Sequence, residues 1–267
     1  ARARQCPPAN PFEGREMSLP EKSGLYDPQF EHDACGVGFV ANIKGVASHE
    51  IVRQGVQILL NLVHRGAAGS DPLTGDGAGI LIQLPHAFFE QECAKLGITL
   101  PARGRYGVGT VFLPQSREER RRCMQIVEDK IGGTGQRLLG WRDVPVDVEA
   151  CGPLARESAP IIRQVIVGST VNDQTVFERK LFVIRKWIER TVRESDLPNR
   201  AKKTFYVPSL SSRTLIYKGL LLAEQLSVFY SDLNDPSMVS ALAMVHQRFS
   251  TNTFPTWQLA QPFRTLA

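Results

Sequence analysis

The strongest constraint on this fold is an abrupt change in the character of the sequence at Cys35. Residues 1–34 are rich in Pro, Glu, Arg and Asn and show no sustained apolar period, which is typical of an extended leader. The run CGVGFVANI, which starts at Cys35, is β-branched and aromatic and is interrupted by Gly36 and Gly38, as in a strand. We therefore predict a leader over 1–34 and a folded domain over 35–267.

Composition excludes several classes of protein. With 42% apolar and 22% charged residues the chain is neither fibrous nor fully disordered. No apolar run reaches the roughly 18 residues of a membrane-spanning helix, and no apolar stretch follows the basic N-terminus as in a secretory signal. The five cysteines lack zinc-type spacing, so we expect free thiols, no metal site and a cytoplasmic protein.

The charge balance gives little reason to expect a nucleic-acid partner. Lys and Arg exceed Asp and Glu by 32 to 27, a weak basic excess. The basic run REERRR at 117–122 precedes apolar residues at helical spacing, Met124, Val127 and Ile131. We interpret 117–122 as the solvated end of a helix rather than as a phosphate-binding patch.

The apolar periods predict strands and helices without strict alternation, which favours an α+β fold over a doubly wound sheet. A helical face runs from Ile51 to Val63, and Gly66 is its expected stop. A strand, a Ser-rich turn and a helix are predicted over 203–230. We expect another helix at 86–97, and strands at 79–84, 105–114, 137–147, 160–169, 180–186 and the start of 241–257. Residues 186–195 then turn helical, although 177–189 could instead form one amphipathic helix.

The first candidate site is Cys35 itself. If the leader were removed after Ala34, Cys35 would become the N-terminal residue, and its α-amino group, with a pKa of ~7.7–8.0, could act as the base for its own thiol. The alternative is an unreactive cysteine in a buried strand.

The second candidate is the glycine-dense segment 66–79, which follows His64-Arg65. Such a backbone turns tightly or approaches a ligand closely. The segment lacks the Lys-Ser/Thr pair of a phosphate-binding loop and the alternating acids of an EF-hand. An ordinary turn-rich loop is the alternative.

The third candidate is HQRFSTNT at 246–253. Arg248 offers a planar set of donors suited to a carboxylate, and Thr251 offers a hydroxyl three residues on. The alternative is a surface arginine in a polar turn. The nearby aromatic residues lie between prolines and are not interleaved with basic residues, which argues against single-stranded nucleic acid.

Taken in order, CGVGF, HRGAAGSDPLTGDGAGI and HQRFSTNTFPTW resemble the class II glutamine amidotransferases, and most closely the domain found in the large subunit of glutamate synthases. SSRTLIYKG at 211–219 and NTFPTW strengthen the resemblance to the glutamate synthase domain in particular. The resemblance covers residues 23–267. It implies an N-terminal-nucleophile hydrolase fold, a four-layer αββα sandwich with two antiparallel sheets between helical layers.

The resemblance also implies roles for five residues. Cys35 would be the catalytic nucleophile, exposed by removal of the propeptide 1–34. Arg248 would bind the α-carboxylate of glutamine, with Thr251 beside it and Arg65 bracing the nucleophile pocket. Phe249 stands where the family often has Tyr or Trp, so any hydroxyl contact from that position is lost.

By the same resemblance the activity is that of a glutaminase, which releases glutamate and ammonia, and the ammonia aminates 2-oxoglutarate in the synthase domains of the same chain. The whole enzyme would carry FMN and a 3Fe–4S cluster and would use an electron-donor small subunit, with no membrane partner. An HNGE-type segment that supplies the oxyanion hole would follow Ala267, so we expect 35–267 to be an incomplete domain. Another ammonia acceptor and a non-catalytic domain of the same fold are the alternatives.

Overall fold

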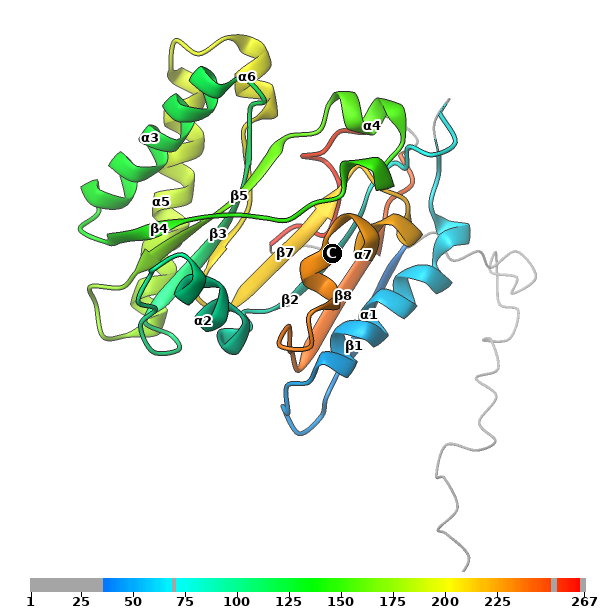
Figure 1. Cartoon of the computed structure of the whole chain (residues 1–267), viewed down its shortest axis with the longest axis horizontal. Helices are drawn as coiled ribbons and strands as arrows, with labels where there is room; N and C mark the ends of the chain where they lie inside the picture. The colour runs from blue at the N-terminus through cyan, green and yellow to red at the C-terminus, as the bar shows by residue number, and fades with distance from the viewer. Residues whose placement is uncertain (1–35, 69–70, 251–253, 265–267) are drawn as a thin grey trace, which may run out of the picture. The chain divides into compact units, whose positions relative to one another are not determined.

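The computed structural model describes residues 36–68, 71–250 and 254–264, which form two four-stranded antiparallel sheets and the helices packed on them (Figure 1). The first sheet has the order β1-β8-β2-β7 and the second the order β4-β5-β3-β6. The strands are β1 Val37–Ala41, β2 Ala78–Gln83, β3 Tyr106–Leu113, β4 Arg137–Asp143, β5 Ile161–Gly168, β6 Tyr206–Ser211, β7 Thr214–Gly219 and β8 Leu242–Gln247. The predicted α+β class is confirmed.

The two sheets are joined by consecutive strands. β6 lies at the edge of the second sheet and β7 at the edge of the first, with only Ser212 and Arg213 between them. The amide of Ile216 in β7 donates a hydrogen bond of 3.3 Å to Oγ of Ser209 in β6. The two sheets therefore lie next to each other along these two edge strands.

One helix covers the first sheet. Helix α1, His49–Asn61, ends before the predicted stop, with Leu62 as its C-cap. Gly66 instead ends the short 3₁₀ helix η2, Val63–Arg65, which follows α1. Apolar side chains at helical spacing, among them Val52 and Leu59, are buried in the core. A methyl group on Gly55 would lie 2.7 Å from Cβ of Ala243 in β8, so a glycine lets the helix approach the strand closely.

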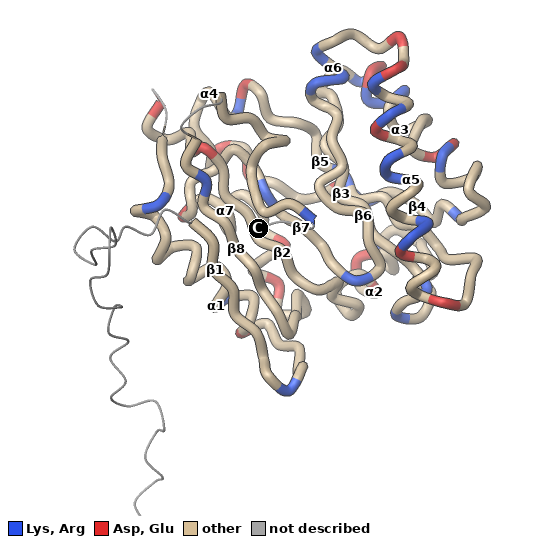
Figure 2. Tube along the Cα trace, turned by 180° about the vertical axis from the view of Figure 1, so that it is seen from behind, with Lys and Arg blue, Asp and Glu red and all other residues tan. Residues whose placement is uncertain are grey.

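Two helices, α3 Arg117–Gly133 and α5 Gln174–Glu194, cover one face of the second sheet and pack on each other. In Figure 2 the traces of both helices carry Lys and Arg positions, in blue, among Asp and Glu positions, in red. Helix α3 begins at Ser116, whose Oγ accepts from the amide of Glu119, and Arg117, Arg121 and Arg122 are exposed. The interpretation of 117–122 as a solvated helix end is confirmed.

The predicted strand over 180–186 is wrong, because those residues lie inside α5 and the alternative of one amphipathic helix is correct. Asp173 begins the helix by accepting hydrogen bonds from the amides of Thr175 and Val176. The buried residues then recur every three or four positions: Phe177, Leu181, Ile184, Ile188 and Val192. The apolar run LFVI looks like a strand only when these flanking positions are ignored.

The predicted helix after the Ser-rich turn is also wrong in its first part, where strand β7 lies. Residues 215–219 are all buried, so the segment has no alternation that would indicate a strand. Helix α7 is confined to Leu226–Phe229. The remaining helices are α2 His86–Lys95, α4 Pro153–Glu157, α6 Asn199–Thr204, and the 3₁₀ helices η3 Val148–Ala150, η4 Ala223–Gln225 and η5 Ser231–Asn234. No helix in the described ranges is long and apolar enough to cross a membrane.

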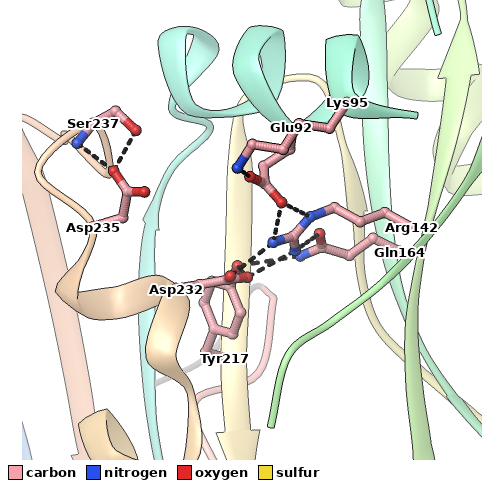
Figure 3. Close-up of polar contacts among 8 residues, drawn as sticks. All are labelled: Glu92, Lys95, Arg142, Gln164, Tyr217, Asp232, Asp235 and Ser237. Carbon is pink, nitrogen blue, oxygen red and sulfur yellow. Dashed lines mark hydrogen bonds and ion pairs between the residues drawn. The ribbon is translucent and has the colours of Figure 1, made fainter. Parts of the chain in front are cut away.

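A buried polar network connects the sheets through α2 and η5 (Figure 3). Arg142 of β4 is its centre and donates to Glu92, Gln164 and Asp232. Asp232 also accepts a 2.7 Å hydrogen bond from the hydroxyl of Tyr217 in β7. Burial alone would lower the pKa of Arg142, but the hydrogen bonds and charge of Asp232 raise it. Burial and the neighbouring Asp232 raise the pKa of Tyr217.

Candidate active site

The ends of three adjacent strands bring the three sequence segments together. β8 lies between β1 and β2, so its C-terminal end meets the N-terminal ends of both neighbours. The amide of Gln247 donates to the carbonyl oxygen of Gly36 over 2.7 Å, and the amide of Arg248 donates to the carbonyl oxygen of Gly77 over 2.8 Å. The residue that follows Cys35, the glycine-rich segment and Arg248 therefore share one edge of the first sheet.

The HRG segment also lies at this edge. A methyl group on Gly36 would lie 1.9 Å from the carbonyl oxygen of Gln247 and 3.6 Å from Cβ of Arg65. A methyl group on Gly66 would lie 2.2 Å from Nε2 of Gln247. Both glycines are required by this close approach, and they allow the half-buried Arg65 to lie beside the start of β1.

The loop before β2 is held by its own side chains. Oδ2 of Asp71 accepts a 2.6 Å hydrogen bond from Thr74, which is the largest cause of the lowered pKa of Asp71. Gly77 has a φ of 134°, which favours glycine. The neighbouring Asp76 is buried, and its Oδ2 accepts a 2.6 Å hydrogen bond from the amide of Ser250. The loop thus fixes the backbone on both sides of Phe249.

The structure places some of the predicted site residues and not others. Arg65 and Arg248 lie at the shared edge and are half-buried, whereas Phe249 is 62% exposed. Cys35 and Thr251 lie outside the described residues, but their neighbours Gly36 and Ser250 are held at this edge.

Two basic side chains near this edge have lowered pKa values. Burial and then the charge of Arg248 lower the pKa of His246 to about 4, so this imidazole is neutral at physiological pH. Burial, followed by the charges of Arg264 and Arg248, lowers the pKa of Lys218 to about 7. Arg248 contributes to both shifts, and its guanidinium group at this edge is suited to an anionic ligand such as a carboxylate.

Sequence reasoning did not assign roles to Asp76, Gln247 or Lys218. Lys218 could have been found, because a lysine inside the apolar run TLIYKGLLL must bury its charge or leave the strand. The side-chain hydrogen bond of Asp76 joins residues 174 positions apart in the chain, and no local pattern marks it.

Three other cysteines are poor candidates for a nucleophile. Cys93, Cys123 and Cys151 are buried in the two cores. Burial raises the pKa of Cys93 to about 11 and that of Cys123 to about 12, and it also raises the pKa of Cys151. Their thiolate forms are therefore scarce at neutral pH.

The family follows from a comparison with known proteins. The sequence profile of the class II glutamine amidotransferases matches residues 35–267, which is most of the chain. The chain belongs to the class II glutamine amidotransferases. In this amidotransferase the profile match begins at Cys35, the residue before the Gly36 that pairs with β8.

Curated relatives are glutamate synthases. The amidotransferase chain is 52% identical over 250 residues to the glutamate synthase [NADPH] large chain of Bacillus subtilis, covering 93% of this chain and 16% of that protein. It is 42% identical over 260 residues to the glutamate synthase [NADH] of Saccharomyces cerevisiae, covering 93% of this chain and 12% of that protein. A chloroplastic ferredoxin-dependent glutamate synthase of Arabidopsis thaliana is 39% identical over 248 residues, covering 92% of this chain and 15% of that protein. The chain thus spans less than a fifth of the length of these relatives.

Proposed function

We propose that the chain is the glutaminase domain of a glutamate synthase large chain, which hydrolyses glutamine and supplies ammonia for the amination of 2-oxoglutarate. The observation that carries the proposal is that Gly36, Arg65 and Arg248 meet at one edge of the first sheet. Gly36 directly follows Cys35 in the sequence. The sequence identity to glutamate synthases favours 2-oxoglutarate as the ammonia acceptor over the acceptor of another class II amidotransferase.

Cys35 is the proposed nucleophile, and residues 1–34 are the propeptide whose removal exposes it. The thiol proton passes to the free α-amino group while sulfur attacks the side-chain amide carbon of glutamine. The carbon–nitrogen bond of the resulting tetrahedral intermediate breaks, and ammonia leaves with a proton returned by the α-amino group. Water then attacks the γ-glutamyl thioester, which releases glutamate and restores the thiol.

Arg248 is the proposed binding group for the α-carboxylate of glutamine. Its position at this edge and the 2.8 Å backbone bond that fixes it to Gly77 support this role. Thr251 follows it as a hydroxyl donor, and Arg65 braces the nucleophile from the HRG segment. Phe249, which has no hydroxyl, contributes an apolar wall to the substrate site.

The four-layer αββα sandwich is the arrangement we propose for the whole domain. Two of its helical coverings are supported by the packing of α1 on the first sheet and of α3 with α5 on the second. The described strands would then be parts of the two central layers.

The cofactors and partners of the proposal belong to the longer protein. In the part of the chain that the structure describes, no three His, Cys, Asp or Glu side chains lie close enough together to hold a metal ion, and the described residues do not fit a 3Fe–4S cluster. We therefore assign FMN and the cluster to the synthase domains. The cytoplasm is the proposed location of the whole enzyme. The relatives' names carry NADPH, NADH and ferredoxin as electron donors. An electron-donor small subunit is the proposed partner of the whole enzyme.

The test is a Cys35→Ala substitution in the whole protein, with Cys151→Ala as the matched control. We expect Cys35→Ala to abolish glutamine-dependent glutamate synthesis and to spare synthesis from ammonia. Cys151→Ala should retain both reactions. N-terminal sequencing of the active protein should begin at Cys35, and full glutaminase activity of a protein that retains residues 1–34 would contradict the proposed mechanism.

A further inference from the structure

Lys218 is a buried polar side chain that the proposed chemistry does not use. It lies in β7 with 1% of its surface exposed. Its Nζ donates to the carbonyl oxygens of Gln258 and Ala260, over 2.9 Å and 2.6 Å. The ring centres of Tyr206 and Phe263 lie 4.7 Å and 4.5 Å from Nζ. Nζ is thus directed at the backbone of one segment, residues 257–261, here called the crossing segment.

Glycines allow the crossing segment to lie directly on β2 and β7. Gly79 is paired with Lys218 in the β2–β7 register, so the two residues share a face of the sheet. A methyl group at any of three glycines would collide with the segment: 2.8 Å from Cβ of Ala260 at Gly77, 2.4 Å from the carbonyl oxygen of Gln261 at Gly79, and 2.6 Å from the ring of Trp257 at Gly219. The two hydrogen bonds from Nζ of Lys218 tether the segment in this position.

The tether continues to Arg248. Ala260, whose carbonyl oxygen is bound by Lys218, packs against Gly77. Gly77 in turn accepts the 2.8 Å hydrogen bond from the amide of Arg248. A continuous set of contacts therefore runs from Nζ of Lys218 through Ala260 and Gly77 to the end of β8.

We propose that Lys218 is a positioning residue of the amidotransferase site, and that the hydrogen bonds from its Nζ hold the crossing segment on Gly77 and thereby fix Arg248 for the α-carboxylate of glutamine. This inference rests on the proposed glutaminase function. It goes beyond that function because Lys218 binds no reacting atom and acts through the crossing segment. A purely structural lysine would affect the folded fraction but not the affinity for one substrate.

The first test is Lys218→Met in the whole protein. We expect the KM for glutamine to rise about tenfold, as for loss of a charge-assisted hydrogen bond, with kcat changed by less than about threefold. Synthesis from ammonia should be unchanged, which reports an intact fold. The exposed Lys44→Met is the matched control and should leave the KM unchanged. An unchanged KM in Lys218→Met overturns the proposal, whereas a wild-type protein without glutaminase activity refutes the proposed function.

A second variant reaches the same segment from the opposite strand. A methyl group at Gly79 would lie 2.4 Å from the carbonyl oxygen of Gln261 and 2.6 Å from Cβ of Lys218. Gly79→Ala should therefore displace both the segment and the side chain that holds it, and should also raise the KM for glutamine. Combined with Lys218→Met it should add little, because both changes act through one element. Gly132→Ala is the control, since a methyl group there meets open space. Full additivity of the two effects would contradict a shared path.

A measurement without substitutions near Lys218 decides the case if those variants do not fold. In Cys35→Ala protein, which cannot turn over glutamine, L-glutamine should slow amide hydrogen exchange in residues 257–261, because coupling between two sites is reciprocal. Glutamine that binds without this protection overturns the proposal. Glutamine that does not bind at all counts against the proposed function instead.

Discussion

The guanidinium group of Arg142 binds both carboxylate oxygens of Asp232, with Nη1–Oδ2 and Nη2–Oδ1 distances of 2.8 Å and 2.7 Å. The side chains of the two residues are 4% and 3% exposed. Since Arg142 belongs to the second sheet and the Tyr217 that also binds Asp232 belongs to the first, the pair joins the two halves of the core.

Removing one partner of this pair should destabilise the protein strongly. Asp232→Ala leaves the buried Arg142 with Glu92 as its remaining anion and leaves the Tyr217 hydroxyl without its acceptor. We expect a loss of about 3–5 kcal/mol in the free energy of unfolding. Urea denaturation measures it, with the exposed pair member Glu194→Ala as a control that should cost less than about 1 kcal/mol. A small loss in Asp232→Ala would show that water replaces the carboxylate.

A glutamine-analogue electrophile should label Cys35 and leave Cys93, Cys123 and Cys151 unmodified. The raised pKa values of the buried thiols keep them protonated, while an N-terminal Cys35 has its own base. Peptide mapping by mass spectrometry after labelling near neutral pH measures the distribution. Labelling spread evenly over these thiols would argue against Cys35 as the nucleophile.

Arg248→Lys should raise the KM for glutamine although the charge is retained. A guanidinium group can bind a carboxylate through two parallel hydrogen bonds, whereas an ammonium group is a single point of attachment. Loss of one charge-assisted bond, roughly 1.5–3 kcal/mol, corresponds to about ten- to a hundred-fold in affinity. Steady-state kinetics with glutamine measures it, and the exposed Arg213→Lys is the control.

The pH dependence of stability should report Lys218. Its pKa is lowered from 10.5 to about 7 in the folded protein, so between these values the unfolded chain binds more protons than the folded one. The free energy of unfolding should therefore rise with pH across this window. Below the window both states are protonated, so the free energy of unfolding should no longer change with pH through Lys218.

Relative to Lys218→Met, the wild-type protein should gain roughly 2 kcal/mol between about pH 7 and about pH 9. Urea denaturation of both proteins at the two pH values isolates the contribution of Lys218, because the other titrating groups are common to both. An unchanged difference would mean that the ammonium group keeps its ordinary pKa when buried.

The sequence was most informative where local chemistry decides the structure. Helix α1, strand β1 and the helix over 117–133 follow from apolar periodicity and local residue preferences. The predicted stop at Gly66 ends the 3₁₀ turn after α1 rather than α1 itself. Strand β7 could not be separated from a helix, because burial on both faces removes the alternation that marks a strand.

The candidate site was only partly accessible for a related reason. Arg65 and Arg248 stand in short motifs, so resemblance pointed to them. Lys218 acts through contacts with Gln258 and Ala260 that depend on how the chain crosses Gly79. Tertiary contacts of this kind leave a trace in the sequence only as an unexplained charge in an apolar run.

The pairing of β1 with β8 also sets the order of events during synthesis. β1 ends at Ala41, and the strand it pairs with begins only at Leu242. At about 5–20 residues per second, the ribosome leaves β1 without that neighbour for on the order of ten seconds or longer. The edge that joins Gly36 to Arg248 therefore cannot assemble on a short nascent chain, and a chain released early would carry Cys35 without the arginine proposed to bind its substrate.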